Sequence, residues 1–131
     1  MYTKIRIDLL LEDFADDPQI ITSYLGVQPK TTHIKGEQIE GRPESTWSKN
    51  TWLISSGIDE DESFESHLGS IMNEIDSKYS KFLELSGKCN IFLNCVIKMY
   101  EGDRPFISFD KRTIKKLGVL NAEIEFDLYN Y

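Results

Sequence analysis

The sequence predicts an α+β domain with a mainly antiparallel sheet and helices packed on one face. Two segments, Lys4–Glu12 and Leu120–Tyr129, alternate apolar and polar residues as half-buried strands do. The segment 89–100 is apolar on both faces, which is typical of a central strand. Residues 64–83 repeat apolar side chains at helical spacing. A ferredoxin-like or related sandwich would bury all of these stripes.

The strand 4–12 is followed by a short helix with clear boundary signals. Asp17 is a favourable N-cap, Pro18 suits the first helical position, and Gly26 is suited to ending the helix in a left-handed conformation. The next segment, 28–46, has little periodicity, so we expect a surface loop with a short edge strand near residues 33–39. A functional or mobile loop is the alternative. Strand-forming residues then predict a strand over 46–56.

The second half predicts a long helix that starts at Phe64 and ends at Gly87. After the central strand, Glu101–Pro105 is typical of a hairpin connection, and Phe106–Phe109 would form the return strand. Asp110 can cap a short helix that is closed by Gly118. The predicted order is therefore β-α-(loop)-β-α-β-β-α-β.

Size and composition favour one globular domain. The chain has 131 residues, of which 40% are hydrophobic and 28% charged. No apolar run approaches the roughly 18 residues that cross a bilayer, and the N-terminus lacks signal-peptide features, so we expect a cytoplasmic protein. Cys89 and Cys95 would lie about 20 Å apart on one strand, too far for a disulfide.

The negative charge is concentrated in the first half of the sequence. Net charge is −7; residues 1–65 contain 13 acidic and 6 basic residues, whereas 66–131 contain nine of each. Negative surfaces repel nucleic acid and anionic membranes, so neither is an expected partner. An acidic surface suits solubility or a basic protein partner. The sequence does not indicate an oligomeric state.

The sequence contains no recognisable catalytic, cofactor-binding or metal-binding motif. Neither of the two histidines, His33 and His67, has another histidine or a cysteine at metal-ligand spacing. We expect His67 to be a helix-surface residue, and both cysteines to be buried and inert. The predictions are therefore a protein that is not an enzyme, with no metal and no cofactor.

Two acidic clusters are the best candidates for a partner-binding surface, with aromatic residues beside them as anchors. The candidate residues are Asp13, Asp16, Asp17, Tyr24, Trp47, Asp59, Glu60, Asp61 and Glu62. The structural alternative is that both clusters precede helices, where acidic side chains interact favourably with the helix dipole.

The chain resembles a bacterial family described as domain of unknown function 4279. The matching residues are the opening strand, Ile21-Thr22, Leu25-Gly26-Val27, Pro29, Lys35-Gly36-Glu37, Trp52-Leu53-Ile54, His67-Leu68, Leu117-Gly118 and Asp127-Leu128-Tyr129. The likeness spans nearly the whole chain but supplies no catalytic residues. It implies a bacterial cytosolic domain, and some members would serve as immunity proteins beside toxins.

These observations favour a non-catalytic binding protein, with an immunity protein that neutralises a basic toxin as the leading hypothesis. A toxin that acts on nucleic acid needs a basic face, which an acidic inhibitor can cover. The alternative is a small-ligand-binding or regulatory domain that uses the sheet face beneath the 28–46 segment as a pocket.

Overall fold

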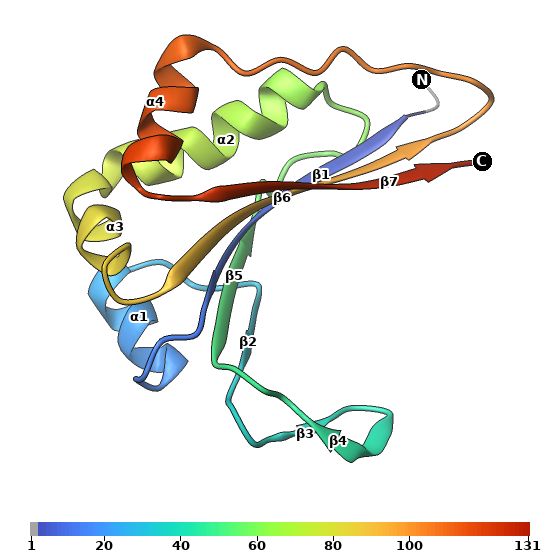
Figure 1. Cartoon of the computed structure of the whole chain (residues 1–131). Helices are drawn as coiled ribbons and strands as arrows, with labels where there is room; N and C mark the ends of the chain where they lie inside the picture. Colours follow the sequence, from blue (N-terminus) through green and yellow to red (C-terminus); the bar gives the residue numbers. More distant parts are fainter. Residues whose placement is uncertain (1–2) are drawn as a thin grey trace.

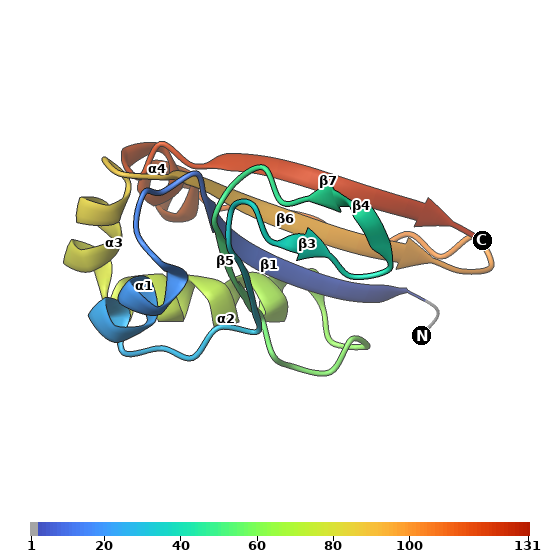
Figure 2. The same ribbon diagram turned by 90° about the horizontal axis from the view of Figure 1, so that it is seen from below.

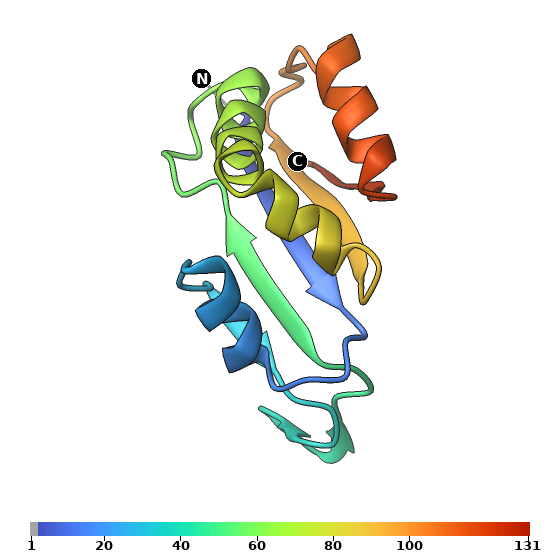
Figure 3. The same ribbon diagram turned by 90° about the vertical axis from the view of Figure 1, so that its left-hand side faces the viewer.

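A computed structural model describes residues 3–131 and confirms the α+β class. The main sheet consists of β1 (Lys4–Glu12), β2 (Thr31–His33), β5 (Thr51–Ser55), β6 (Asn90–Met99) and β7 (Glu123–Asn130), in the order β2-β5-β1-β6-β7. Four helices, α1 (Pro18–Leu25), α2 (Phe64–Ser77), α3 (Tyr79–Leu85) and α4 (Lys111–Val119), lie on one face of this sheet (Figures 1 and 3). We call the other face the open face.

Strand β1 lies at the centre of the sheet and is antiparallel to both neighbours, β5 and β6. Its alternation is the predicted one. Ile5, Ile7, Leu9 and Leu11 are buried beneath the helices. The intervening side chains therefore belong to the open face, because successive residues of a strand point to opposite faces.

The core contains residues from elements throughout the chain, from β1 to the turn after α4. Trp52, Phe64 and Phe82 are its largest fully buried side chains. The indole Nε1 of Trp52 donates a hydrogen bond to Thr22 Oγ1 at 3.0 Å, so this large side chain is buried with its polar atom satisfied.

The first helix confirms its predicted boundaries. The Asp17 carboxylate accepts a hydrogen bond from the backbone N–H of Gln19 at 2.8 Å, and Pro18 occupies the first turn. Gly26 follows with φ +69°, a left-handed conformation that glycine adopts without steric cost.

The segment 28–46 is more structured than we predicted. It contains β2, which pairs with β5, and a separate hairpin of β3 (Gln38–Ile39) and β4 (Arg42–Thr46). The expected strand over 46–56 is therefore divided, because Thr46 ends β4 and only Thr51–Ser55 joins the main sheet. The hairpin projects from the open side of the sheet (Figures 1 and 2).

The predicted long helix is interrupted at Lys78, which has φ −135° and ψ 35°. Helix α2 ends before Lys78 and α3 begins after it, although no proline or glycine stands there. The apolar stripe continues across the break. Ile75 and Phe82, on either side of it, are both fully buried.

The predicted hairpin after β6 is wrong. Residues 106–109 form no strand, and the chain returns through α4, so β7 is parallel to β6. A parallel pair needs a long crossover, and the stretch from Tyr100 to Ala122 supplies it. Helix α4 also continues past Gly118, and the left-handed residue that follows it is Asn121, with φ +53°.

Within residues 3–131, no helix combines the length and the apolar character that crossing a bilayer requires.

Candidate functional site

The two acidic clusters singled out from the sequence lie near opposite ends of β1. Asp13–Asp17 follow the C-terminal end of the strand. Asp59–Glu62 adjoin its N-terminal end, where the Ile5 N–H donates to the carbonyl of Glu60 at 2.9 Å. The nine residues of β1 span about 26 Å. The two clusters therefore do not form one continuous surface.

Several of these carboxylates have partners within the chain. Asp17 caps α1, and Asp59 Oδ1 accepts a hydrogen bond from the Asp61 N–H at 2.8 Å. Asp61 pairs with the Lys4 ammonium at 2.5 Å. That hydrogen bond and charge lower the pKa of Asp61 and raise the pKa of Lys4. The contact of Asp17 supports the structural alternative for the first cluster, whereas Asp59 and Asp61 are held by a turn and by Lys4 rather than by a helix end.

The two predicted aromatic anchors also make intramolecular contacts. Tyr24, on α1, donates a hydrogen bond to Glu84 of α3, and its ring lies 5.3 Å from Lys81 Nζ. Trp47 follows β4 and stacks on His33 with ring centroids 3.6 Å apart. The structure therefore places the two anchors in different parts of the molecule.

The surface prediction for His67 is wrong, because its side chain is 0% exposed. His67 Nε2 lies 3.1 Å from the carbonyl oxygen of Asp59, which can only accept, so Nε2 is protonated. Nδ1 then accepts from the Ser56 hydroxyl at 2.5 Å. Burial lowers the pKa of His67, which keeps the imidazole neutral.

The Ser56–His67 pair resembles a nucleophile and its base, and no sequence signal indicated it. Ser56, however, is only 5% exposed, and its Oγ also accepts from the backbone N–H of Ile7 at 3.3 Å. We interpret the pair as a polar clamp that joins β5, β1 and α2 to the loop containing Asp59.

The cysteines are unpaired thiols, as predicted, but only Cys95 is buried; Cys89 precedes β6 and is partly exposed. Burial raises the pKa of Cys89 to about 11 and that of Cys95 to about 12. Thiols with such pKa values are poor nucleophiles. Among residues 3–131, no group of three or more His, Cys, Asp or Glu side chains is arranged to hold a metal ion.

A third group of carboxylates, which sequence reasoning did not select, lies on β7. Glu123, Glu125 and Asp127 alternate with apolar residues, and the register with β6 puts them on the open face beside Phe92, Asn94 and Val96. All three are exposed. None of the ion pairs within residues 3–131 includes them. We call these three residues the acidic edge.

Two residues of the acidic edge, Glu125 and Asp127, border a groove of about 400 Å³ that also includes Arg6, Asp8 and Asn94. Arg6 Nε lies 3.1 Å from both carboxylate oxygens of Asp8, so this guanidinium already has an acidic partner. Asn94 Oδ1 is buried and accepts no hydrogen bond. Asp127 accepts a hydrogen bond from the Tyr129 hydroxyl at 2.9 Å. The groove still offers carboxylate oxygens without a charged partner, and it suits donors such as ammonium or guanidinium groups.

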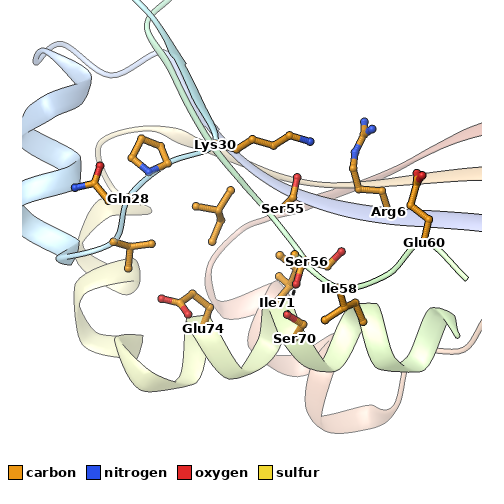
Figure 4. Close-up of a pocket in the computed structure, with 14 residues that line it drawn as sticks. Arg6, Gln28, Lys30, Ser55, Ser56, Ile58, Glu60, Ser70, Ile71 and Glu74 are labelled. Atoms are coloured by element: carbon orange, nitrogen blue, oxygen red, sulfur yellow. Dashed lines mark hydrogen bonds between the residues drawn. The ribbon is translucent and has the colours of Figure 1, made fainter. Parts of the chain in front are cut away.

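A larger cleft of about 700 Å³ lies between β5 and α2. Figure 4 shows Arg6, Lys30 and Ser55 on the sheet side and Ser70 and Glu74 on the helix side. The cleft also includes Glu60, so acidic and basic side chains are balanced in its lining. Such a cleft could bind a small polar molecule, but it favours neither sign of charge.

The family comparison agrees with the resemblance noted from the sequence. The model of the family described as "Domain of unknown function (DUF4279)" matches residues 3–131, and the chain belongs to this family. Searches of curated proteins and of solved structures give no match.

Proposed function

We propose that this chain is a non-catalytic binding protein whose partner is a basic protein, and that the partner contacts the acidic edge. The observation that supports this proposal is the convergence of Glu123, Glu125 and Asp127 on one exposed strand, without ion-pair partners in the described chain. Complementary charge of this kind speeds association and orients a partner more than it adds affinity.

The narrower form of the proposal is an immunity protein that neutralises a cognate bacterial toxin. A toxin that acts on nucleic acid needs Lys and Arg side chains to neutralise phosphates. The acidic edge would cover such a surface and exclude the substrate by occupying the same cationic groups.

An affinity-capture experiment tests both forms. The wild-type chain, the variant Glu125→Lys/Asp127→Lys and the matched control Glu60→Lys/Glu62→Lys are immobilised and exposed to a lysate of the source organism. We expect the wild type and the control to retain the same basic protein, identified by mass spectrometry, and the β7 variant to lose it.

The immunity function predicts a further result. The captured protein, expressed alone, should stop growth, and co-expression of the wild-type chain but not of Glu125→Lys/Asp127→Lys should restore it. Equal capture by the wild type and the β7 variant would contradict the proposed site. Normal growth with the captured protein alone would show that this protein is not a toxin and would contradict the immunity function.

The alternative function is binding of a small polar ligand in the cleft between β5 and α2. The observation in its favour is Lys30, which faces this cleft and forms none of the ion pairs found within residues 3–131. A thermal-shift screen against a metabolite panel tests it. A hit should lose its effect in Lys30→Ala, whereas a panel without hits would count against this function.

A further inference from the structure

Strand β7 is an edge strand with one side of its backbone unpaired. The Tyr131 N–H donates to the Met99 carbonyl at 2.8 Å, and the Tyr131 carbonyl accepts from the Glu101 N–H at 3.3 Å. Tyr131 therefore points its backbone groups toward β6. Because successive residues of a strand alternate, Phe126 and Leu128 point theirs away from β6, where the sheet ends.

Apart from its three carboxylates, β7 lacks the usual devices that protect an edge strand. Its eight residues include no proline, glycine or lysine, and the register with β6 runs without a bulge from Glu123 to Asn130. An edge that is long, regular and unpaired is a template for a further strand.

The side chains of β7 divide into two chemically different rows. On the open face lies the acidic edge. On the helix face lie Ile124, Phe126 and Leu128, which are 39%, 46% and 57% exposed although their register partners on β6 are buried. The acidic row therefore lacks charge partners, and the apolar row lacks part of the apolar contacts that would bury it.

A second copy of this chain does not fit this edge. In an antiparallel pair of two β7 strands about a two-fold axis normal to the sheet, side chains on the same face stand opposite each other. When Phe126 of one copy lies opposite Phe126 of the other, Glu125 of each copy lies opposite Asp127 of the other. Shifting the register by two residues in either direction again places carboxylates of the two copies opposite each other. Like charges directly opposite are destabilising, so the charge pattern favours a strand of different composition.

We propose that the basic partner contributes a β-strand to the outer edge of β7, with basic and apolar side chains alternating along it; this inference rests on the proposed function. The basic side chains lie on the open face against the acidic edge. The apolar ones cover Ile124, Phe126 and Leu128. The backbone groups of Phe126 and Leu128 pair with those of the added strand, and alternate side chains provide the specificity.

The first test uses a synthetic peptide of about eight residues in which lysine and valine alternate. Its control carries N-methyl groups on alternate backbone nitrogens, so one edge of the peptide cannot donate hydrogen bonds. We expect NMR titration to shift the amide signals of Ile124, Phe126 and Leu128, and their hydrogen exchange to slow. The methyl groups can be placed on either of the two alternating sets of nitrogens, which gives two control peptides. At least one of these two peptides should bind at least about tenfold more weakly than the unmethylated peptide.

The second test acts on the protein. Leu128→Pro removes one outward N–H while leaving the side of β7 that faces β6 intact, and Leu128→Ala removes the same side chain but keeps the N–H. Circular dichroism and thermal melting establish that both variants fold. We expect Leu128→Pro to weaken peptide binding at least about fivefold beyond Leu128→Ala.

The outcomes separate this inference from the proposed function. If both methylated peptides and Leu128→Pro bind as well as their controls, while Glu125→Lys/Asp127→Lys does not bind, the charged surface is correct and strand addition is wrong. If the peptide does not bind the wild type, strand addition is wrong, and the affinity capture alone decides the proposed function. If the peptide binds the charge-reversed variant equally well, the acidic edge is not the binding surface and the proposed site is wrong as well.

Discussion

The acid-rich first half and the electrically neutral second half of the chain use their carboxylates differently. In the first half, Asp17 caps a helix, and Asp8, Glu12 and Asp61 pair with Arg6, Lys49 and Lys4. In the second half, Asp76 pairs with Arg112 and Lys116 in the helix layer, whereas the three carboxylates of β7 have no ion-pair partners within the described chain. Net charge over half a chain therefore does not locate a charged surface.

The largest expected effect concerns the clamp that holds one acidic loop to the core. His67→Ala should lower the free energy of unfolding by about 3 kcal/mol, because it leaves a cavity and removes the hydrogen-bond partner of the buried Ser56 hydroxyl. Urea denaturation measures this change. The control His33→Ala alters only a stacked side chain outside the core. A loss below about 0.5 kcal/mol in His67→Ala would mean that the clamp does not stabilise the fold.

The same clamp predicts a pH dependence. Burial lowers the pKa of His67 in the folded chain. Below about pH 6.5 the imidazole is therefore protonated in the unfolded chain but stays neutral in the folded chain. Stability should therefore fall as pH decreases from 7.5 to 5.5. His67→Gln, which does not titrate, should lose less over this range. Parallel stability curves for the two proteins would contradict the lowered pKa.

The smallest effect distinguishes a structural acidic residue from the acidic edge. Asp17→Ala should lower the free energy of unfolding by about 1 kcal/mol through loss of the helix cap. Asp17→Asn should retain most of this stability, because asparagine also caps helices. Glu125→Gln/Asp127→Asn should change stability by no more than about 0.5 kcal/mol. The denaturation midpoints of the three variants measure these changes in stability. A larger loss in the β7 variant would show that these carboxylates stabilise the fold.

Local signals predicted several elements correctly. Alternation identified β1 and β7, and Asp17, Pro18 and Gly26 identified α1, because strand alternation and helix capping depend on neighbouring residues alone. The connection from β6 to β7 was not predictable in this way. Glu101–Pro105 has turn-forming residues, but whether the next strand pairs directly or crosses over depends on packing against distant elements.

The candidate site was missed for the same reason. The alternation of Glu123, Glu125 and Asp127 with apolar residues was visible in the sequence, but an antiparallel return strand would have placed a different segment beside β6. Only the parallel register shows that β7 ends the sheet and that Glu125 and Asp127 border the groove containing Asn94. His67 was misplaced because its flank position on the helix did not reveal Ser56 as a partner.

The most direct test of the account compares charge reversal in the two regions against the same lysine–valine peptide by titration calorimetry. Glu125→Lys/Asp127→Lys should weaken binding by about 30-fold, because each change replaces a modest attraction with a modest repulsion. Glu60→Lys/Glu62→Lys should change it less than about threefold. Equal effects of the two variants, or a larger effect at Glu60 and Glu62, would contradict the assignment of the partner surface to β7.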